Sequence, residues 1–308
     1  MKKLLFLFVF LSLVITVLFN CSSSSIDKMQ DKTLSSKSYY TGKYKNLFTE
    51  LLKIPENEVQ KKLNQIFNYF FYGNDSTERV YYPVGNDMAY IADILHDDVR
   101  TEGMSYGMMI AVQMNKKNEF DRLWKWAKTY MQHSTLDRMG YFAWHCKRDG
   151  TKLDLNSASD GEEWFVMSLL FASARWGDGE GIYNYKAEAQ FILDNMLNKD
   201  NSNESKITNM FDKKGKMVVF VPTKDDSWFT DPSYHLPHFY ELWARWSKTN
   251  NKFWCDVANT SRDFFKKVAH PVTGLMPDYS SFNGIPLNPW NGGSDNFQYD
   301  AWRCVMNI

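Results

Sequence analysis

The sequence predicts an all-α domain built from helical hairpins. Apolar residues recur about every 3.6 residues over most of the chain after residue 43, and strand signals are few. The links between the periodic segments are rich in Gly, Asp and Asn, which favours loops between neighbouring helices. A chain of 308 residues has room for two domains, but no linker divides it after residue 43, so we expect one domain over residues 43–308.

The periodic segments give the expected elements in order along the chain. Helices are expected around Val59–Phe71, Phe120–Tyr130, Trp164–Ala174 and Phe191–Leu197, then at Ser233–Ser247, at Phe253–Val268, and from near Asp295 onward. Short strands are expected at Val80–Tyr82 and Met217–Val221, within connections. The helices should therefore supply most of the core.

The N-terminus predicts export. Lys2 and Lys3 precede an apolar run over residues 4–19, which is short for a spanning helix and typical of an export signal. Cys21 follows this run as in a bacterial lipoprotein signal, although Asn20 leaves simple cleavage or an uncleaved anchor as alternatives. We expect a signal or lipoprotein segment over residues 1–21 and a linker over 22–42. The protein would then be periplasmic, an outer-surface lipoprotein or secreted, with the membrane contacted only through this anchor.

The amino-acid composition limits the kinds of partner that the protein is expected to bind. The chain has 36 basic and 36 acidic residues and no basic stripe, which argues against nucleic acid. Its 11 Trp and 17 Tyr suit stacking on sugar rings as well as core packing. Cys146, Cys255 and Cys304 are too far apart for a zinc motif and are expected to be buried thiols. His235 and His238 lack a third ligand, so we expect neither a metal nor a cofactor.

The segment Asp98–Met109 is the most informative. Glu102 stands at the start of an apolar helix, with Gly103 and Gly107 one turn apart behind it. Each glycine costs about 1 kcal/mol in a helix interior, so we expect another backbone or a ligand to approach there closely. An acid beside such a surface suits a glycosidic bond. The alternative is that Glu102 only complements the helix dipole.

Two further carboxylates stand out by position. Asp160, in the segment Ser157–Phe165, lies at the start of a helix, where it is either functional or an N-cap. Asp300 lies between aromatic residues on the last expected helix, where it is either functional or a partner of Arg303 one turn on.

These segments together resemble glycoside hydrolase family 8. The resemblance is carried by Asp98–Met109, Tyr141–His145, Ser157–Phe165 and Tyr299–Arg303, and it runs from about residue 40 to the end. Within the family the chain is similar to reducing-end xylose-releasing exo-oligoxylanases, a similarity supported by the segment Phe120–Met131.

The resemblance implies a fold and an activity. The fold is an (α/α)6 barrel of helical hairpins, and the activity is inverting hydrolysis of β-1,4-xylo-oligosaccharides with release of xylose from the reducing end. The alternatives are an endo-acting xylanase or β-glucanase of the same family, or a non-catalytic glycan-binding lipoprotein remnant. Closing twelve helices needs roughly 70–90 more residues than follow Asp300, so we expect the barrel to lack its last three or four helices.

The resemblance also implies roles for individual residues. Glu102 would be the general acid, Asp300 the general base that activates water, and Asp160 the carboxylate that holds the distorted sugar. An inverting pair of this kind stands about 6.5–9.5 Å apart. A general acid needs a raised pKa, so burial and the charge of Asp160 must outweigh the helix dipole at Glu102.

Four more residues would contact the substrate or its neighbours. Trp144 matches a tryptophan that stacks on the sugar, and Tyr234 matches a tyrosine that helps to hold the catalytic water. Tyr299 belongs to the motif of the base, and Arg303 would orient Asp300.

Overall fold

The computed structural model describes residues 45–308 except 76, 136 and 200–204. The expected signal segment and linker, residues 1–21 and 22–42, lie outside the described residues. The α-helices are α4 (Leu47–Glu50), α5 (Glu56–Tyr72), α6 (Thr101–Gln113), α7 (Lys117–Trp126), α8 (Ser159–Trp176), α9 (Tyr185–Leu197), α10 (Pro237–Trp246), α11 (Asn251–Val268) and α12 (Cys304–Asn307). Shorter turns are η2 (Ala127–Met131), a π-helix, and the 3-10 helices η3 (Gly181–Tyr183), η4 (Pro232–Tyr234) and η5 (Tyr299–Arg303).

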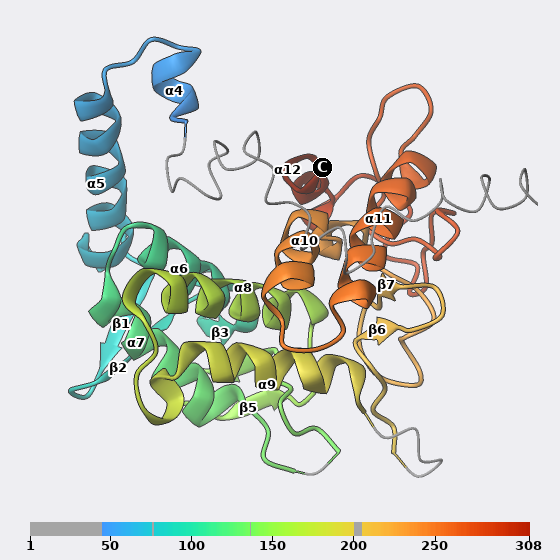
Figure 1. The fold of residues 1–308 in the computed structure, drawn as a ribbon, viewed down its shortest axis with the longest axis horizontal. Helices are drawn as coiled ribbons and strands as arrows, with labels where there is room; N and C mark the ends of the chain where they lie inside the picture. The colour runs from blue at the N-terminus through green and yellow to red at the C-terminus, as the bar shows by residue number, and fades with distance from the viewer. Residues whose placement is uncertain (1–44, 76, 136, 200–204) are drawn as a thin grey trace, which may run out of the picture.

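Packed helix pairs confirm the predicted all-α architecture. In sequence order, α6 packs on α8, α8 on α9, and α10 on α11. Figure 1 shows α8 in the middle of the molecule, with α5 toward one end and the α10–α11 pair toward the other. Twelve of the 18 residues of α8 are buried, so this helix is covered on several sides rather than along one stripe.

Small antiparallel sheets add more strands than the sequence predicts. They pair β1 (Tyr81–Val84) with β2 (Met88–Ile91), β3 (Asp98–Arg100) with β4 (His145–Lys147) and β5 (Lys152–Asp154), and β6 (Phe211–Asp212) with β7 (Met217–Val218). The two predicted strands correspond to β1 and β7. The others are two to four residues long, and β3 pairs with a partner more than 40 residues away, so local periodicity cannot find them.

Two helix boundaries differ from the prediction. The helix expected at Ser233–Ser247 is divided, because Pro237 opens α10 and holds Leu236 in a non-helical conformation with φ −120°. The last helical segment begins at Tyr299 rather than near Asp295, and α12 follows η5 directly.

The glycines of α6 face a side chain rather than a ligand. A Cβ on Gly107 would stand 2.5 Å from Cγ1 of Ile91 on β2, and one on Gly103 would stand 3.3 Å from its Cγ2. The prediction that these two glycines form a surface for a glycosidic bond is therefore wrong, because the side chain of Ile91 fills the space beside them. A close approach that the sequence did not predict is at Gly161, where a Cβ would stand 2.5 Å from the hydroxyl of Thr101. The absence of a side chain at Gly161 lets α8 and α6 approach each other closely beside Glu102.

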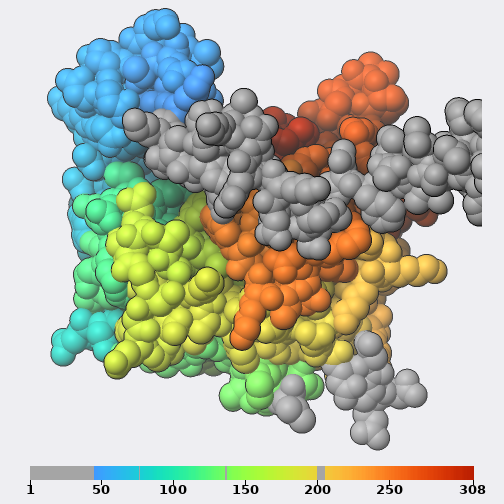
Figure 2. Space-filling view, viewed as in Figure 1, coloured from blue at the N-terminus to red at the C-terminus, as the bar shows by residue number. Residues whose placement is uncertain are grey.

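The core joins both ends of the helix array. Trp124, Trp243 and Trp254 are almost completely buried in one large cluster that spans the sheets and most helices. In space-filling view the surfaces of α9 and the α10–α11 pair adjoin (Figure 2), and the Lys248 N–H donates to the Gln190 side chain there. Within the described part of the chain, none of the helices has the length and apolar character needed to cross a membrane.

The thiol prediction is only partly right. Cys146 and Cys304 are buried free thiols, whereas Cys255 is half-buried and disulfide-bonded, so it is not a free thiol.

Candidate active site

The four sequence segments singled out above converge on one cavity of about 280 Å³. Its lining residues are Arg100, Thr101, Glu102, Trp144, Ala158, Asp160, Tyr234, Asp278, Tyr279, Tyr299 and Asp300. Thr101 donates its backbone N–H to the Trp144 carbonyl at 3.0 Å, which ties the first turn of α6 to the start of β4. Six of the seven predicted site residues thus face the same space.

Arg303, the seventh, lies beneath the cavity and connects its carboxylates. Nη1 donates to Glu102 and to Asp160, each at 2.9 Å, while Nη2 lies 2.8 Å from Oδ2 of Asp300. The side chain of Arg303 is only 4% exposed. A buried guanidinium with a fixed fork of donors therefore sets the relative positions of three carboxylates that come from distant parts of the chain.

Glu102 has the protonation behaviour that a general acid needs. Burial and the neighbouring charge of Asp160 together raise the pKa of Glu102 to about 7, although the charge of Arg303 lowers it. The predicted conflict with the helix dipole is thus decided by burial in a cavity of low dielectric constant. The Ser105 hydroxyl donates to the Glu102 carbonyl at 3.0 Å and braces this turn.

Asp160 is the most deeply buried carboxylate of the three. It is the second residue of α8, and Ala158 is the N-cap, so the alternative that Asp160 caps the helix is wrong. Burial raises the pKa of Asp160, and the charge of Arg303 lowers it.

Asp300 is more open, with 40% of its side chain exposed. It follows Tyr299, which has φ +42°, a backbone conformation that a tyrosine rarely adopts. The pairing of Asp300 with Arg303 is real, but it does not exclude a functional role because the same guanidinium also holds Glu102 and Asp160.

The predicted aromatic residues differ in exposure. Trp144 is half-buried on the cavity wall, and the Arg100 guanidinium lies 5.6 Å from its ring centroid. Tyr234 is buried, with its ring stacked 5.9 Å from that of Phe220. Tyr299 is 72% exposed at the cavity rim.

Sequence reasoning missed several residues of the site. Tyr106 accepts a hydrogen bond from Arg303 Nη1 at 2.6 Å, and Ser233 accepts one from Nη2 at 3.1 Å. Asp278 is 2% exposed beside Asp300, and burial raises its pKa to about 6. Tyr106 lies one helical turn from Glu102, a spacing that marks it as a neighbour. Asp278 lies in a loop with no periodic or motif signal.

The histidine pair lies apart from this chemistry. His235 is fully buried between the hydroxyls of Thr230 and Ser261, and burial lowers its pKa to about 3. It is therefore a neutral core residue. Among the described residues, no group of three or more His, Cys, Asp and Glu side chains is arranged to hold a metal ion.

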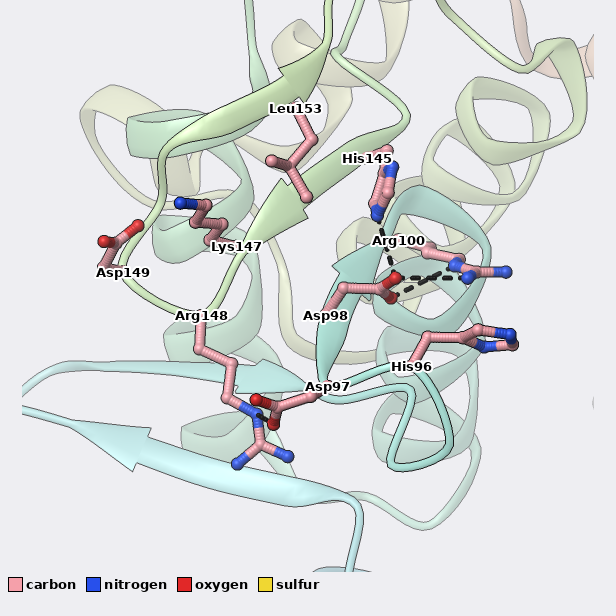
Figure 3. Close-up of a pocket in the computed structure, with 9 residues that line it drawn as sticks. All are labelled: His96, Asp97, Asp98, Arg100, His145, Lys147, Arg148, Asp149 and Leu153. Atoms are coloured by element: carbon pink, nitrogen blue, oxygen red, sulfur yellow. Dashed lines mark hydrogen bonds and ion pairs between the residues drawn. The ribbon is translucent and has the colours of Figure 1, made fainter.

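A second, larger cavity of about 690 Å³ is lined by residues of β3, β4 and β5 and of the turns next to these strands (Figure 3). Several of its charged side chains are paired with one another: Asp98 with His145 at 2.8 Å and with Arg100 at 3.1 Å, and Asp97 with Arg148 at 2.9 Å. Arg100 lines both cavities. Of these two cavities, only the smaller one combines an acid whose pKa is raised to about 7, Glu102, with a second, more open carboxylate, Asp300.

Comparison with known proteins gives one consistent family. The sequence model of glycosyl hydrolases family 8 matches residues 92–308. The chain is 47% identical over 272 residues to reducing-end xylose-releasing exo-oligoxylanase Rex8A of Paenibacillus barcinonensis, covering 88% of this chain and 70% of that protein. It is 40% identical over 279 residues to the reducing end xylose-releasing exo-oligoxylanase of Halalkalibacterium halodurans, covering 90% of this chain and 70% of that protein. A xylohexaose complex of a family 8 xylanase mutant from Teredinibacter turnerae superposes with a TM-score of 0.83 at 47% identity, covering 88% of this chain and 72% of that one.

Proposed function

Because the chain belongs to glycosyl hydrolases family 8, we propose that it hydrolyses β-1,4-linked xylo-oligosaccharides with inversion and releases xylose from the reducing end. It is a glycoside hydrolase, and it has the family's (α/α)6-barrel fold over the part it shares with these relatives, which is 70% of the length of Rex8A. The exo mode of action is supported by the similarity to the exo-oligoxylanases of Paenibacillus barcinonensis and Halalkalibacterium halodurans.

The observation that carries the mechanism is the shared guanidinium of Arg303. Glu102 and Asp300 bind different nitrogens of this one group, so their separation is set by one guanidinium and two hydrogen bonds. An inverting mechanism needs the two carboxyl groups about 6.5–9.5 Å apart, which leaves room for the attacking water. Protonated Glu102 donates its proton to the leaving oxygen. Ionised Asp300 takes a proton from the water that attacks the anomeric carbon on the opposite face.

The remaining site residues hold the sugar and the water. Asp160 accepts hydrogen bonds from hydroxyl groups of the distorted sugar at the cleavage point, and Trp144 stacks on a sugar ring. Tyr234, whose ring lies 5.8 Å from the Arg303 guanidinium, helps to position the attacking water. Tyr299 contacts the sugar at the open rim.

Xylotetraose labelled with ¹⁸O at its reducing-end anomeric position tests this function. The expected first products are labelled xylose and unlabelled xylotriose, with the newly formed reducing end of xylotriose in the α configuration by NMR. Unlabelled xylose, or xylotriose that carries the label, would reject reducing-end release. A β-configured first product would reject inversion.

Endo-acting xylan hydrolysis is the second candidate, because the Teredinibacter turnerae xylanase is as similar to this chain as Rex8A is. Early release of long, mixed oligomers from polymeric xylan favours this candidate over the exo mode. If the protein binds glycans but forms no product from xylo-oligosaccharides or β-glucan, the result favours the alternative of a non-catalytic glycan-binding protein.

We further propose that the chain is exported and lipidated at Cys21. The support is the basic flank of Lys2 and Lys3, the apolar run over residues 4–19 and the cysteine that follows it. Metabolic labelling with a fatty acid should mark the wild type but not the variant Cys21→Ser. Export of an unlabelled wild-type protein would instead favour a cleaved signal.

A further inference from the structure

A continuous row of aromatic rings leads from the active-site cavity to the surface. This aromatic row consists of Phe220, Trp228, Phe229, Tyr279 and Trp290. Tyr279 lines the cavity, and its ring centroid lies 5.6 Å from that of Trp290. Tyr279 also contacts Phe229, which leads to the second exposed tryptophan. The ring centroid of Phe229 lies 5.6 Å from that of Tyr279 and 4.7 Å from that of Trp228. Each outer indole is thus linked to the catalytic cavity through an unbroken series of ring contacts.

The two ends of the aromatic row face solvent. Trp290 is 56% exposed and Trp228 is 53% exposed, whereas Phe229 between them is fully buried. A single exposed apolar side chain needs no explanation. Two exposed tryptophans that share buried aromatic neighbours and adjoin a catalytic cavity are a different case, because the buried rings hold both indoles in place.

The loop that carries Trp290 is built before any ligand arrives. The Gly293 N–H donates to the Asn288 side chain at 2.9 Å, closing a turn around Trp290. Asn291 and Gly293 have φ of +56° and +84°, a conformation that Asn and Gly tolerate best. The turn therefore fixes the indole with little conformational entropy left to lose on binding.

A backbone bridge joins the two segments of the aromatic row. The Thr230 N–H donates to the Ser280 carbonyl and the Ser280 N–H donates to the Thr230 carbonyl, both at 3.0 Å. Thr230 follows Phe229, and Ser280 follows Tyr279. The bridge therefore locks the segment of Trp228 beside the segment of Trp290.

We propose that Trp290, together with Trp228, forms an outer sugar-binding platform that stacks a xylose ring lying beyond the catalytic cavity. This inference rests on the proposed function. A cavity of about 280 Å³ is at the small end of ligand pockets, so most of an oligosaccharide must lie outside it. The C–H faces of a pyranose carry partial positive charge and pack well on the electron-rich face of an indole.

Binding without turnover tests the platform. Full-length Glu102→Gln protein, alone and combined with Trp290→Ala or Trp290→Phe, is titrated calorimetrically with xylobiose, xylotriose, xylotetraose and xylohexaose. Trp290→Ala should weaken binding by roughly 3- to 10-fold for the longer chains, with a smaller loss as the chain shortens. Trp290→Phe should restore most of the affinity, because it keeps an aromatic face.

Phe48→Ala provides the matched control. Phe48 is also 56% exposed but lies on α4, which packs on α5, so its removal should change none of the affinities. An equal loss at every chain length, or no loss with Trp290→Ala, overturns the platform. The same result follows if Phe48→Ala reproduces the effect. Hydrolysis by the wild type is scored separately, so a chain that binds through Trp290 but cleaves nothing rejects the proposed function and keeps the platform.

Discussion

Arg303 Nη1 donates a hydrogen bond to Glu102 Oε1 at 2.9 Å, although the two residues are 201 positions apart in the sequence. The same nitrogen also binds Asp160, and Nη2 pairs with Asp300. One buried cation therefore holds the proposed acid and base in a single framework. The charge of Arg303 also limits how far burial raises the pKa of Glu102.

Replacing Glu102 by Gln should reduce kcat on xylo-oligosaccharides by roughly 10²–10⁴-fold, because no proton reaches the leaving oxygen. Aryl xylosides with acidic phenols need little protonation and should lose much less activity. Initial rates on both substrate types check this. Equal losses on both would contradict the role of Glu102 as the acid.

Replacing Asp300 by Ala should abolish activity on both substrate types, because each needs an activated water. Added azide should restore turnover and give an α-configured glycosyl azide. Azide attacks the anomeric carbon without losing a proton, while Glu102 protonates the departing oxygen. The Glu102→Gln variant is the control, since azide cannot supply its missing proton to a natural leaving group. Failure of azide to rescue Asp300→Ala would argue that Asp300 has a structural role.

The activity should fall as pH rises through about 7, the pKa of Glu102, because the ionised form cannot donate a proton. Removing the charge of Asp160 makes ionised Glu102 more stable and lowers its pKa. The alkaline limb of kcat/KM against pH should therefore move to lower pH in Asp160→Asn. The midpoint pH of that limb is the quantity to compare, because the maximum value of kcat/KM also falls when Asp160 loses its contacts with the sugar. An unchanged midpoint contradicts the coupling.

Glu162 should make the free energy of unfolding depend on pH. This side chain is fully buried on α8, and burial raises its pKa to about 8, although the Phe142 N–H donates to it at 2.8 Å. The neutral form is thus favoured in the folded state. The contribution of neutral Glu162 to the free energy of unfolding is complete below the ordinary carboxyl pKa. It is lost as pH rises through about 8, by up to about 1.4 kcal/mol per pH unit.

Urea unfolding between pH 5 and 8 checks this dependence. Glu162→Gln should flatten the decline, because its amide stays neutral at every pH. Glu58→Gln, at an exposed position of α5, should follow the wild type. If Glu162→Gln keeps the wild-type slope, Glu162 is not the group responsible.

The sequence by itself determined the helices and the candidate carboxylates. Apolar periodicity is a local property, so it located α5, α7, α8, α9 and α11, although α9 begins at Tyr185 rather than at Phe191. The four segments around Glu102, Trp144, Asp160 and Asp300 indicated the family, which the comparisons show. Prediction from local sequence failed where contacts between distant residues determine the structure. Examples are the short strands and Gly107, beside which Ile91 fills the space.

Only the tertiary structure decided how these residues work together. Burial sets the pKa of Glu102, and burial depends on the whole chain rather than on neighbours in sequence. The sequence suggested that Arg303 orients Asp300, but the contacts of Arg303 with Glu102 and Asp160 exist only because α6, α8 and η5 meet. Asp278 and Trp290 come from a loop without periodicity, and folding alone places the first beside Asp300, the proposed base, and the second at the end of the aromatic row.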